Sequence, residues 1–275
     1  MKGFLHTARL DISESLRARW FLLYALIFGA IVVILFVFGL SESRVRGFTG
    51  LSRLLVTYIQ LTMAIMPLFV LITTVRSLAG DREAGVNEYM LSLPVSLGAW
   101  YWGRFAGRFV VIFLPVFVAM LGAVLWGALK GAAVPMGQVA WYSLLLLVLS
   151  FCFLGFGFLI SAMARTTEMA QSAALLLWLT LLLFLDLILL GLLIKAQAAP
   201  ELVMTIALLN PLEVFRGGAM ILFDPQLLML GPTAYLILDV FGRTGFMLYS
   251  VLYPIGLGAI LALGGFYVFK RGDYP

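Results

Sequence analysis

The sequence predicts an all-α integral membrane protein with six transmembrane helices, and three observations lead to that prediction. Hydrophobic residues make up 63% of the 275 residues and charged residues only 11%, whereas soluble domains are about half apolar and about a quarter charged. The charged residues fall between long apolar runs rather than within them. Several runs reach the roughly 20 residues that a helix needs to cross a bilayer. Residues 1–275 are therefore expected to form a single transmembrane domain within a lipid bilayer.

Intervals with almost no charged residues define the six predicted spans. They cover about residues 20–40, 54–76, 106–129, 138–163, 169–194 and 245–269. Pro135 and Gly137 favour a turn before the fourth span. Pro254 lies inside the sixth, where a membrane bundle tolerates proline because neighbouring groups bond the freed backbone atoms. The fourth and sixth spans also carry paired glycines that favour close helix packing, namely Gly155, Gly157, Gly256 and Gly258.

Two further segments are predicted to be helical without crossing the membrane. Residues 2–19 predict an amphipathic helix on the membrane surface, because apolar and charged positions alternate at helical spacing. Its apolar positions are Phe4, Leu5, Ala8, Ile12 and Leu16, and its charged positions include Arg9, Glu14 and Arg17. Residues 195–243 are apolar but broken by prolines and acidic residues, so that each piece is too short to cross. This stretch is expected to form re-entrant or interfacial helices at the outer leaflet.

The distribution of basic residues predicts the orientation of the chain. An even number of spans places both termini on the same side, and cytoplasmic loops are enriched in Lys and Arg. With the termini inside, most of the 18 Lys and Arg side chains are cytoplasmic, and Arg44, Arg46 and Arg53 are the main exceptions. We therefore expect a multi-pass protein of the bacterial inner (cytoplasmic) membrane with both termini in the cytoplasm.

Several classes of function are disfavoured by the sequence. It contains no GxxxxGK[ST] phosphate-binding loop, no GxSxG or HExxH motif and no paired acidic metal motif. A single cysteine, Cys152, and a single histidine, His6, exclude a disulfide framework and a cluster of metal ligands of these types. The basic residues do not gather on a soluble face, as they would in a nucleic-acid-binding protein. No catalytic, cofactor or metal site is expected in this chain.

The most informative stretch is the charged segment 80–96, between the second and third predicted spans. Its residues predict a charged turn, a glycine and a short amphipathic helix that ends at Pro94. Tyr89, Met90 and Leu93 would lie on one side of that helix and form an apolar knob that fits a groove on a partner. The alternative interpretation is an ordinary cytoplasmic loop with a surface helix.

This segment resembles the coupling-helix region of type-2 ABC exporter permeases. The matching residues are Glu83, Gly85, Glu88, Leu91, Pro94, Val95 and Ser96. The resemblance implies a permease domain that pairs with a second copy of itself and with two cytoplasmic ATPase subunits, which bind ATP and Mg. The residues that it assigns to ATPase coupling are Asp81, Arg82, Glu83, Gly85, Glu88, Tyr89, Leu91 and Pro94.

Further short motifs resemble one subgroup, the membrane subunit of the ABC transporter that helps to mature the copper sites of nitrous oxide reductase. They are Arg17-Ala18-Arg19-Trp20, Gly47-Phe48-Thr49, Met66-Pro67-Leu68, Phe184-Leu185-Asp186-Leu187 and Leu209-Asn210-Pro211 with Phe215-Arg216. This resemblance implies a periplasmic β-helical accessory protein that docks on the outer loops. The chain departs from the subgroup after Arg216, and that departure leaves the outer partner open.

Individual residues outside the coupling segment allow two interpretations each. Asp186 is a carboxylate within a predicted span, and it marks either a functional polar site or a bonded group that fixes helix packing. Asn210 and Pro211 fit the start of a short helix, and together with Arg216 they are alternatively part of an outer docking surface. Met204, Met220 and Met229 could offer soft copper ligands, but methionine is also common apolar filler.

Three other functions remain open at the level of sequence. One is a generic type-2 ABC exporter of a lipid, a peptide or a drug-like molecule. Another is an ATP-independent transporter or channel, which would predict charged residues along a path and inverted repeats; the spans offer Asp186 and no clear repeat. The third is a membrane scaffold without transport activity.

Overall fold

The computed structural model describes residues 2–17, 21, 23, 26–27, 29–30, 48–86, 96–129, 136–184, 187, 191, 200–222 and 233–271. Throughout these residues the regular elements are helices and no strand occurs, which confirms the all-α prediction for this part of the chain. Four of the described helices are long and apolar enough to cross a membrane, and a bent helix pair makes up to five. The chain is therefore a multi-pass membrane protein. The predicted first span, 20–40, lies largely outside the described residues, so the count of six stays a prediction.

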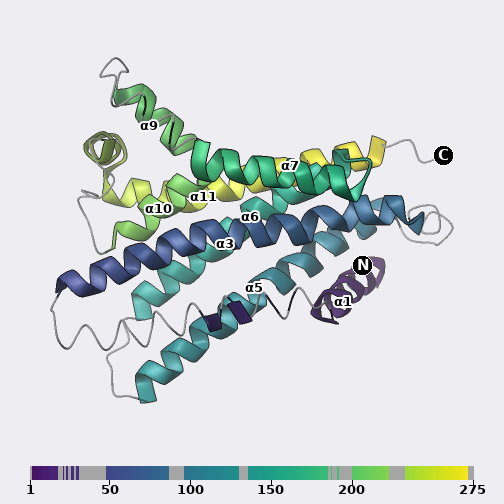
Figure 1. Ribbon diagram of the computed structural model, residues 1–275, viewed down its shortest axis with the longest axis horizontal. Coiled ribbons are helices and arrows are strands. Elements are labelled where there is room, and N and C mark those ends of the chain that lie inside the picture. Colours follow the sequence, from purple (N-terminus) through teal and green to yellow (C-terminus); the bar gives the residue numbers. More distant parts are fainter. Residues whose placement is uncertain are drawn as a thin grey trace.

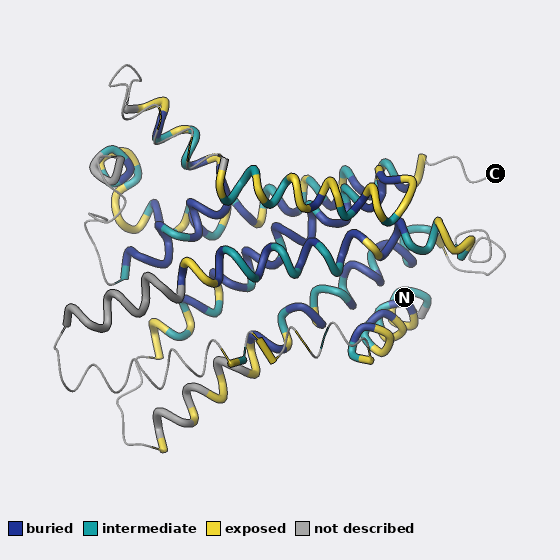
Figure 2. The backbone as a smooth tube through the Cα atoms, viewed as in Figure 1, coloured by how far each residue is buried: buried dark blue, intermediate teal, exposed yellow. Residues whose placement is uncertain are grey.

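The four long helices form a bundle with α6 at its centre. They are α3 (Phe48–Glu83), α5 (Leu97–Leu129), α6 (Met136–Met163) and α11 (Thr233–Arg271). In Figure 1 α6 runs between α3 and α11, and Figure 2 shows that it is buried along most of its length. Helix α6 is apolar on every side, and a helix of that kind is stable only when it is surrounded by protein or lipid. The first described helix and the end of α11 lie at the same end of the bundle, near the labels N and C in Figure 1.

Glycine allows α6 to approach its two neighbours closely. A Cβ atom on Gly258 of α11 would lie 2.9 Å from Cys152 Cα of α6, and one on Gly157 of α6 would lie 2.7 Å from Thr74 Cγ2 of α3. Real Cβ atoms do not come so close, so these positions require glycine. Gly256, in contrast, has no atom near its missing Cβ. Of the paired glycines noted in the sequence, Gly256 therefore has no packing role within one chain.

Helix α1 (Lys2–Arg17) packs against α5 through a polar stripe. Thr7, Asp11 and Ser15, spaced one turn apart, are its buried residues, whereas Leu5 of the predicted apolar face is 63% exposed. The reason lies in α5, which presents arginines and two glycines to α1. A Cβ on Gly107 would lie 2.7 Å from the Ala8 carbonyl oxygen, so the two backbones are almost in contact.

Helix α7 (Thr167–Leu179) lies along α3 and continues into a short π-helix, η1 (Thr180–Phe184). Thr166 precedes α7 and caps it, because its side chain accepts a hydrogen bond from the Met169 N–H. Asp186, two residues beyond η1, lies outside the described residues.

Two short helices, α9 (Pro200–Leu209) and α10 (Pro211–Met220), meet at an angle of 99°. Helix α10 is almost completely buried and packs on α6 and α11 at the end of the bundle opposite α1 (Figure 1). Helix α11 begins at Thr233, within the stretch that the sequence assigns to an outer loop, and bends at Gly242. Gly242 has φ 62° and ψ 172°, a conformation that is essentially restricted to glycine. Residues 195–199 and 223–232 of that stretch lie outside the described residues.

Candidate functional site

The candidate site lies at the α1 end of the bundle, where α3 ends. Three consecutive residues, Asp81, Arg82 and Glu83, each bond a different neighbouring helix. We call these three residues and their partners the α3 junction. These three residues belong to the segment 80–96, which the sequence predicts to be the coupling segment, and residues 84–96 of that segment follow them directly in the chain.

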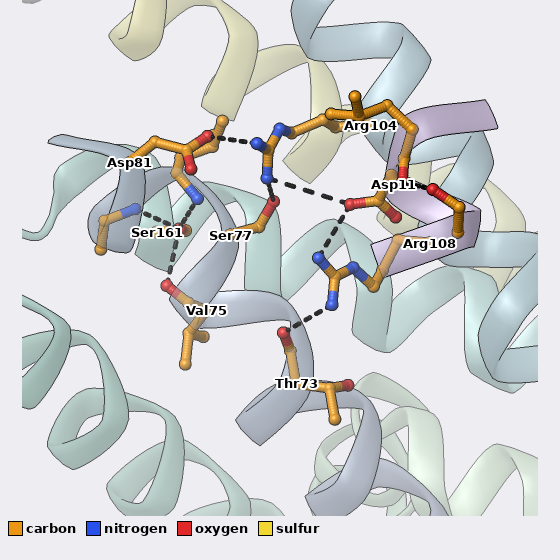
Figure 3. A network of polar contacts seen from close by, with 12 residues as sticks. Asp11, Thr73, Val75, Ser77, Asp81, Arg104, Arg108 and Ser161 are labelled. Atoms are coloured by element: carbon orange, nitrogen blue, oxygen red, sulfur yellow. Dashed lines mark hydrogen bonds and ion pairs between the residues drawn. The ribbon is translucent and has the colours of Figure 1, made fainter. Parts of the chain in front are cut away.

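Asp81 bonds α5 through Arg104. The Arg104 Nη2 atom lies 2.8 Å from Asp81 Oδ2, and its Nη1 donates to Ser77 Oγ at 3.3 Å (Figure 3). The guanidinium carbon also lies 4.5 Å from the centre of the Trp100 ring, a distance at which a cation is attracted by the ring face. Arg104 is buried, so these groups replace the water that it would otherwise bind.

A second arginine of α5 extends the junction to α1. Arg108 Nη2 donates to Asp11 Oδ1 at 2.8 Å, and its Nη1 donates to the Thr73 carbonyl at 3.2 Å. Arg104 Nη1 lies 3.9 Å from the same Asp11 oxygen. Figure 3 shows the Asp11 carboxylate between the two guanidinium groups. Burial raises the pKa of the Asp11 carboxyl above its usual range, and the two arginines oppose that rise.

Arg82 binds the end of α6. Its Nη1 donates to the Ala164 carbonyl at 2.5 Å and its Nη2 donates to the Ala162 carbonyl at 3.2 Å. The last carbonyl groups of a helix have no partner within the helix and carry partial negative charge. A guanidinium group with its fork of donors satisfies two of them at once.

Glu83 binds the start of α7. Its Oε2 accepts hydrogen bonds from the Thr167 hydroxyl at 2.6 Å and from the Thr167 backbone N–H at 3.1 Å. A carboxylate at a helix N-terminus is favourable because the free N–H groups there carry partial positive charge. Arg82 and Glu83 therefore connect α3 to the end of α6 and the start of α7 with charges of the appropriate sign.

Ser161 fixes the same stretch of α3 from the side of α6. Its hydroxyl donates to the Val75 carbonyl at 2.7 Å and accepts from the N–H groups of Leu78 and Ala79, each at 3.0 Å. Ser161 is fully buried, so no water can replace these bonds. The junction is consequently held against α6 both at the end of α3 and one turn before it.

Two residues of the coupling motif bracket the segment itself. Gly85 has φ 68°, and its N–H donates to the Arg82 carbonyl, so it ends α3 in the left-handed conformation that favours glycine. Ser96 precedes α5, and its hydroxyl accepts from the Ala99 N–H at 3.2 Å, which is a helix N-cap. Glu88, Tyr89, Leu91 and Pro94 fall in residues 87–95, which lie outside the described residues.

At the opposite end of the bundle, Asn210 and Pro211 start α10. The Asn210 side chain accepts from the Leu212 N–H at 3.0 Å and Pro211 occupies the first turn. Asn210 and Pro211 thus stand at the start of a short helix, as one of the two interpretations from the sequence expected. Arg216 forms an ion pair with Glu213 on the same helix. No group of three or more His, Cys, Asp or Glu suited to a metal ion occurs among the described residues, and Met229 lies outside them.

Comparison with known proteins establishes the family. A family model described as ABC-2 family transporter protein matches residues 5–274. The chain belongs to the ABC-2 transporter family. Members are permease subunits of ABC transporters and are not themselves catalytic.

Two curated relatives of this ABC-2 permease carry the same name. It is 29% identical over 222 residues to the "Probable ABC transporter permease protein NosY" of Stutzerimonas stutzeri, over 78% of this chain and 80% of the relative. It is 28% identical over 215 residues to the protein of that name in Pseudomonas aeruginosa, over 76% of this chain and 78% of the relative.

Sequence reasoning about this permease missed Asp11, Arg104, Arg108 and Ser161. The available signal was the spacing of Arg104 and Arg108, four residues apart on an otherwise apolar helix. Two arginines on one helix face near the membrane require acidic partners or water. Their partners are far away in the sequence, and only the packing of α1 and α3 on α5 identifies them.

Proposed function

We propose that this chain is the permease subunit of an ATP-driven ABC transporter, and that two copies work with two separate cytoplasmic ATPase subunits. The family supports the class of protein, and the α3 junction supports the site of coupling. In this proposal the α1 end of the bundle is cytoplasmic, the ATPases bind ATP and Mg, and residues 87–95 contact them. The inner membrane and cytoplasmic termini belong to the same proposal.

The observation that carries the proposal is the branching of contacts from three consecutive residues. When the ATPases close on ATP, they would displace residues 87–95 and with them the end of α3. Asp81 would pass that displacement to α5 and α1, Arg82 to α6, and Glu83 to α7. Most of the bundle would thus respond together, which is the requirement for a change between inward-open and outward-open states.

We also propose that the transporter serves the periplasmic maturation of the copper sites of nitrous oxide reductase. The short motifs around Arg17, Met66 and Asn210 support this, as does the similarity to two NosY permeases. A periplasmic β-helical partner would then dock on the outer face near α9 and α10. Purification of the complex from native membranes tests this role. Co-purification of such a partner supports maturation, whereas a complex of permease and ATPase alone favours a generic exporter.

Co-expression with the ATPase subunit that this proposal implies tests the coupling. The wild-type chain is expected to co-purify with the ATPase, whereas Glu83→Ala and Leu91→Ala are expected to reduce assembly or ATP turnover. Glu168→Ala is a matched control, because Glu168 is an exposed acid in the first turn of α7. Unchanged assembly and turnover in both test variants would contradict the placement of the coupling segment.

A further inference from the structure

Helix α7 has few fully buried side chains. Within α7, whose residues are all described, Ala170 and Ala174 are the fully buried ones, and they lie one turn apart. Leu176 is 62% exposed. Leu177 and Trp178 are partly buried against the core, so α7 packs on its neighbours through two small and two partly buried side chains.

Polar contacts attach α7 and η1 to the bundle near both ends. At its start Thr167 bonds Glu83 of the α3 junction. Near its end Trp178 Nε1 donates to the Ala64 carbonyl of α3 at 3.0 Å. Beyond its end the Asn210 amide Nδ2 donates to the Leu181 carbonyl of η1 at 2.7 Å. The helix is thus attached to the junction at one end of the bundle and to the α9–α10 bend at the other.

Asn210 connects two elements with the two ends of one amide. While Nδ2 donates to η1, Oδ1 accepts from the Leu212 N–H and caps α10. The residue is only 1% exposed, so water does not compete for these bonds. Single π-helical turns such as η1 are rare and frequently occur at functional sites.

The other half of the bend is attached to α11. Tyr249 and Tyr253 donate their hydroxyl hydrogens to the last two carbonyls of α9, those of Leu208 at 2.9 Å and Leu209 at 2.6 Å. The first turn of α10 therefore moves with η1, and the last turn of α9 moves with α11. A movement of α7 relative to α11 must change the geometry of the bend between them.

We propose that α7 and η1 transmit the ATP-driven displacement of the α3 junction across the membrane to the α9–α10 bend, with Asn210 as the positioning residue at the far end. This inference rests on the proposed function, since the ATPase supplies the displacement. It assigns to Asn210 and Thr167 a role in coupling the two faces of the membrane. The conformation of the α9–α10 bend on the outer face then changes with the nucleotide that is bound to the ATPase.

A reporter on α9 tests the inference in the assembled complex. Leu202 is 51% exposed, so Leu202→Cys carries an environment-sensitive fluorophore, while the native Cys152 is buried. The permease and ATPase are reconstituted in lipid nanodiscs, and fluorescence is compared without nucleotide and after trapping with ATP and vanadate. Each variant is added to the Leu202→Cys background, and ATP turnover is measured in parallel.

Asn210→Ser and Asn210→Asp separate the two bonds of Asn210. Both keep an oxygen that caps α10, but serine is too short to reach Leu181 and aspartate has no N–H to donate. Both should reduce the fluorescence change at least about fivefold, the lower range of allosteric coupling effects, while ATP turnover persists. Thr167→Val, at the other end of α7, removes the hydroxyl bond to Glu83 but keeps the backbone N–H bond, so it should reduce the fluorescence change by a smaller factor. The control is Thr205→Val, because the Thr205 hydroxyl bonds only the carbonyl of Glu201 in its own helix.

The outcomes separate the inference from the proposed function. If the wild-type complex does not assemble, or if its fluorescence does not change with ATP, both the proposed function and the inference are overturned. A wild-type response that persists at full size in Asn210→Ser, Asn210→Asp or Thr167→Val overturns the inference alone. If an Asn210 variant does not fold, Thr167→Val decides the question by itself.

Discussion

At the scale of single residues, the α3 junction depends on the balance between two guanidinium groups and two carboxylates. Asp11 and Asp81 face Arg104 and Arg108, and each of the four groups is largely removed from water. Breaking such a buried pair costs more than its net contribution to stability, because one charge is left without compensation. The junction should therefore respond differently to the loss of an arginine and to the loss of an aspartate charge.

We expect Arg108→Ala to destabilise the protein more than Asp11→Asn does. Removing Arg108 leaves the Asp11 carboxylate with Arg104 at 3.9 Å, at a cost of up to about 3–5 kcal/mol. Asp11→Asn leaves Arg104 bonded to Asp81 and Arg108 bonded to the Thr73 carbonyl. Thermal unfolding of the purified variants in one detergent measures the difference. Equal losses of Tm would contradict this charge assignment.

The loss of stability in Arg108→Ala should also depend on pH. Burial already raises the pKa of Asp11, and removal of a cation raises it further. A carboxyl with a raised pKa in the folded state contributes stability below its unfolded pKa and loses that contribution as the pH rises through its folded pKa. The difference in Tm between wild type and Arg108→Ala should therefore become smaller as the pH falls from about 7.5 to about 5. For Asp11→Asn the gap should not narrow in the same way, since asparagine does not titrate.

At the scale of elements, packing decided features that periodicity left open. The helix over 2–17 follows from its residue spacing, but its buried stripe is Thr7, Asp11 and Ser15. Periodicity defines the faces of a helix, whereas the partner determines which face is buried. Gly103 and Gly107 let α5 come close to α1, and the arginines on α5 attract Asp11. The prediction placed the apolar face on the membrane surface, and the structure adds that the polar stripe packs on α5.

The close packing of α6 and α11 gives a prediction with a matched control on one helix. Gly258→Ala should lower stability by about 1–3 kcal/mol, because its Cβ would meet the backbone of Cys152 at 2.9 Å. Gly256→Ala should be neutral or stabilising by up to about 1 kcal/mol, since its Cβ would point into open space. Chemical or thermal unfolding of both variants in the same detergent checks the sign. A destabilised Gly256→Ala would instead place that position in a contact between two copies.

At the scale of the whole molecule, both ends of the described chain lie at the α1 end of the bundle (Figure 1). Because α1 and the end of α11 share this end with the α3 junction, we expect both termini to face the cytoplasm with the ATPase. Short epitope tags at each terminus should resist protease added to spheroplasts and be cleaved in inverted vesicles. Cleavage of either tag in intact spheroplasts would reverse the proposed orientation or place the termini on opposite sides.

Several features could be predicted from the sequence alone, and the reason is that each depends on local composition. An apolar chain with few charges needs lipid around it, so the helical membrane fold follows from composition and hydrogen bonding. Asp81, Arg82 and Glu83 were identified through a short motif, and Asn210 with Pro211 through the chemistry of helix capping. These signals extend over a few residues and require no knowledge of the packing.

The tertiary structure decided which of these residues act on one another. Arg104 binds groups from α1 and α3, Glu83 reaches the start of α7, and Asn210 joins η1 to α10. Such hydrogen bonds and ion pairs form only within about 3 to 4 Å, and helix packing, rather than sequence spacing, brings these atoms to that distance. Composition therefore determined that this chain is a helical membrane protein, whereas the packing of its helices determined how its two ends are connected.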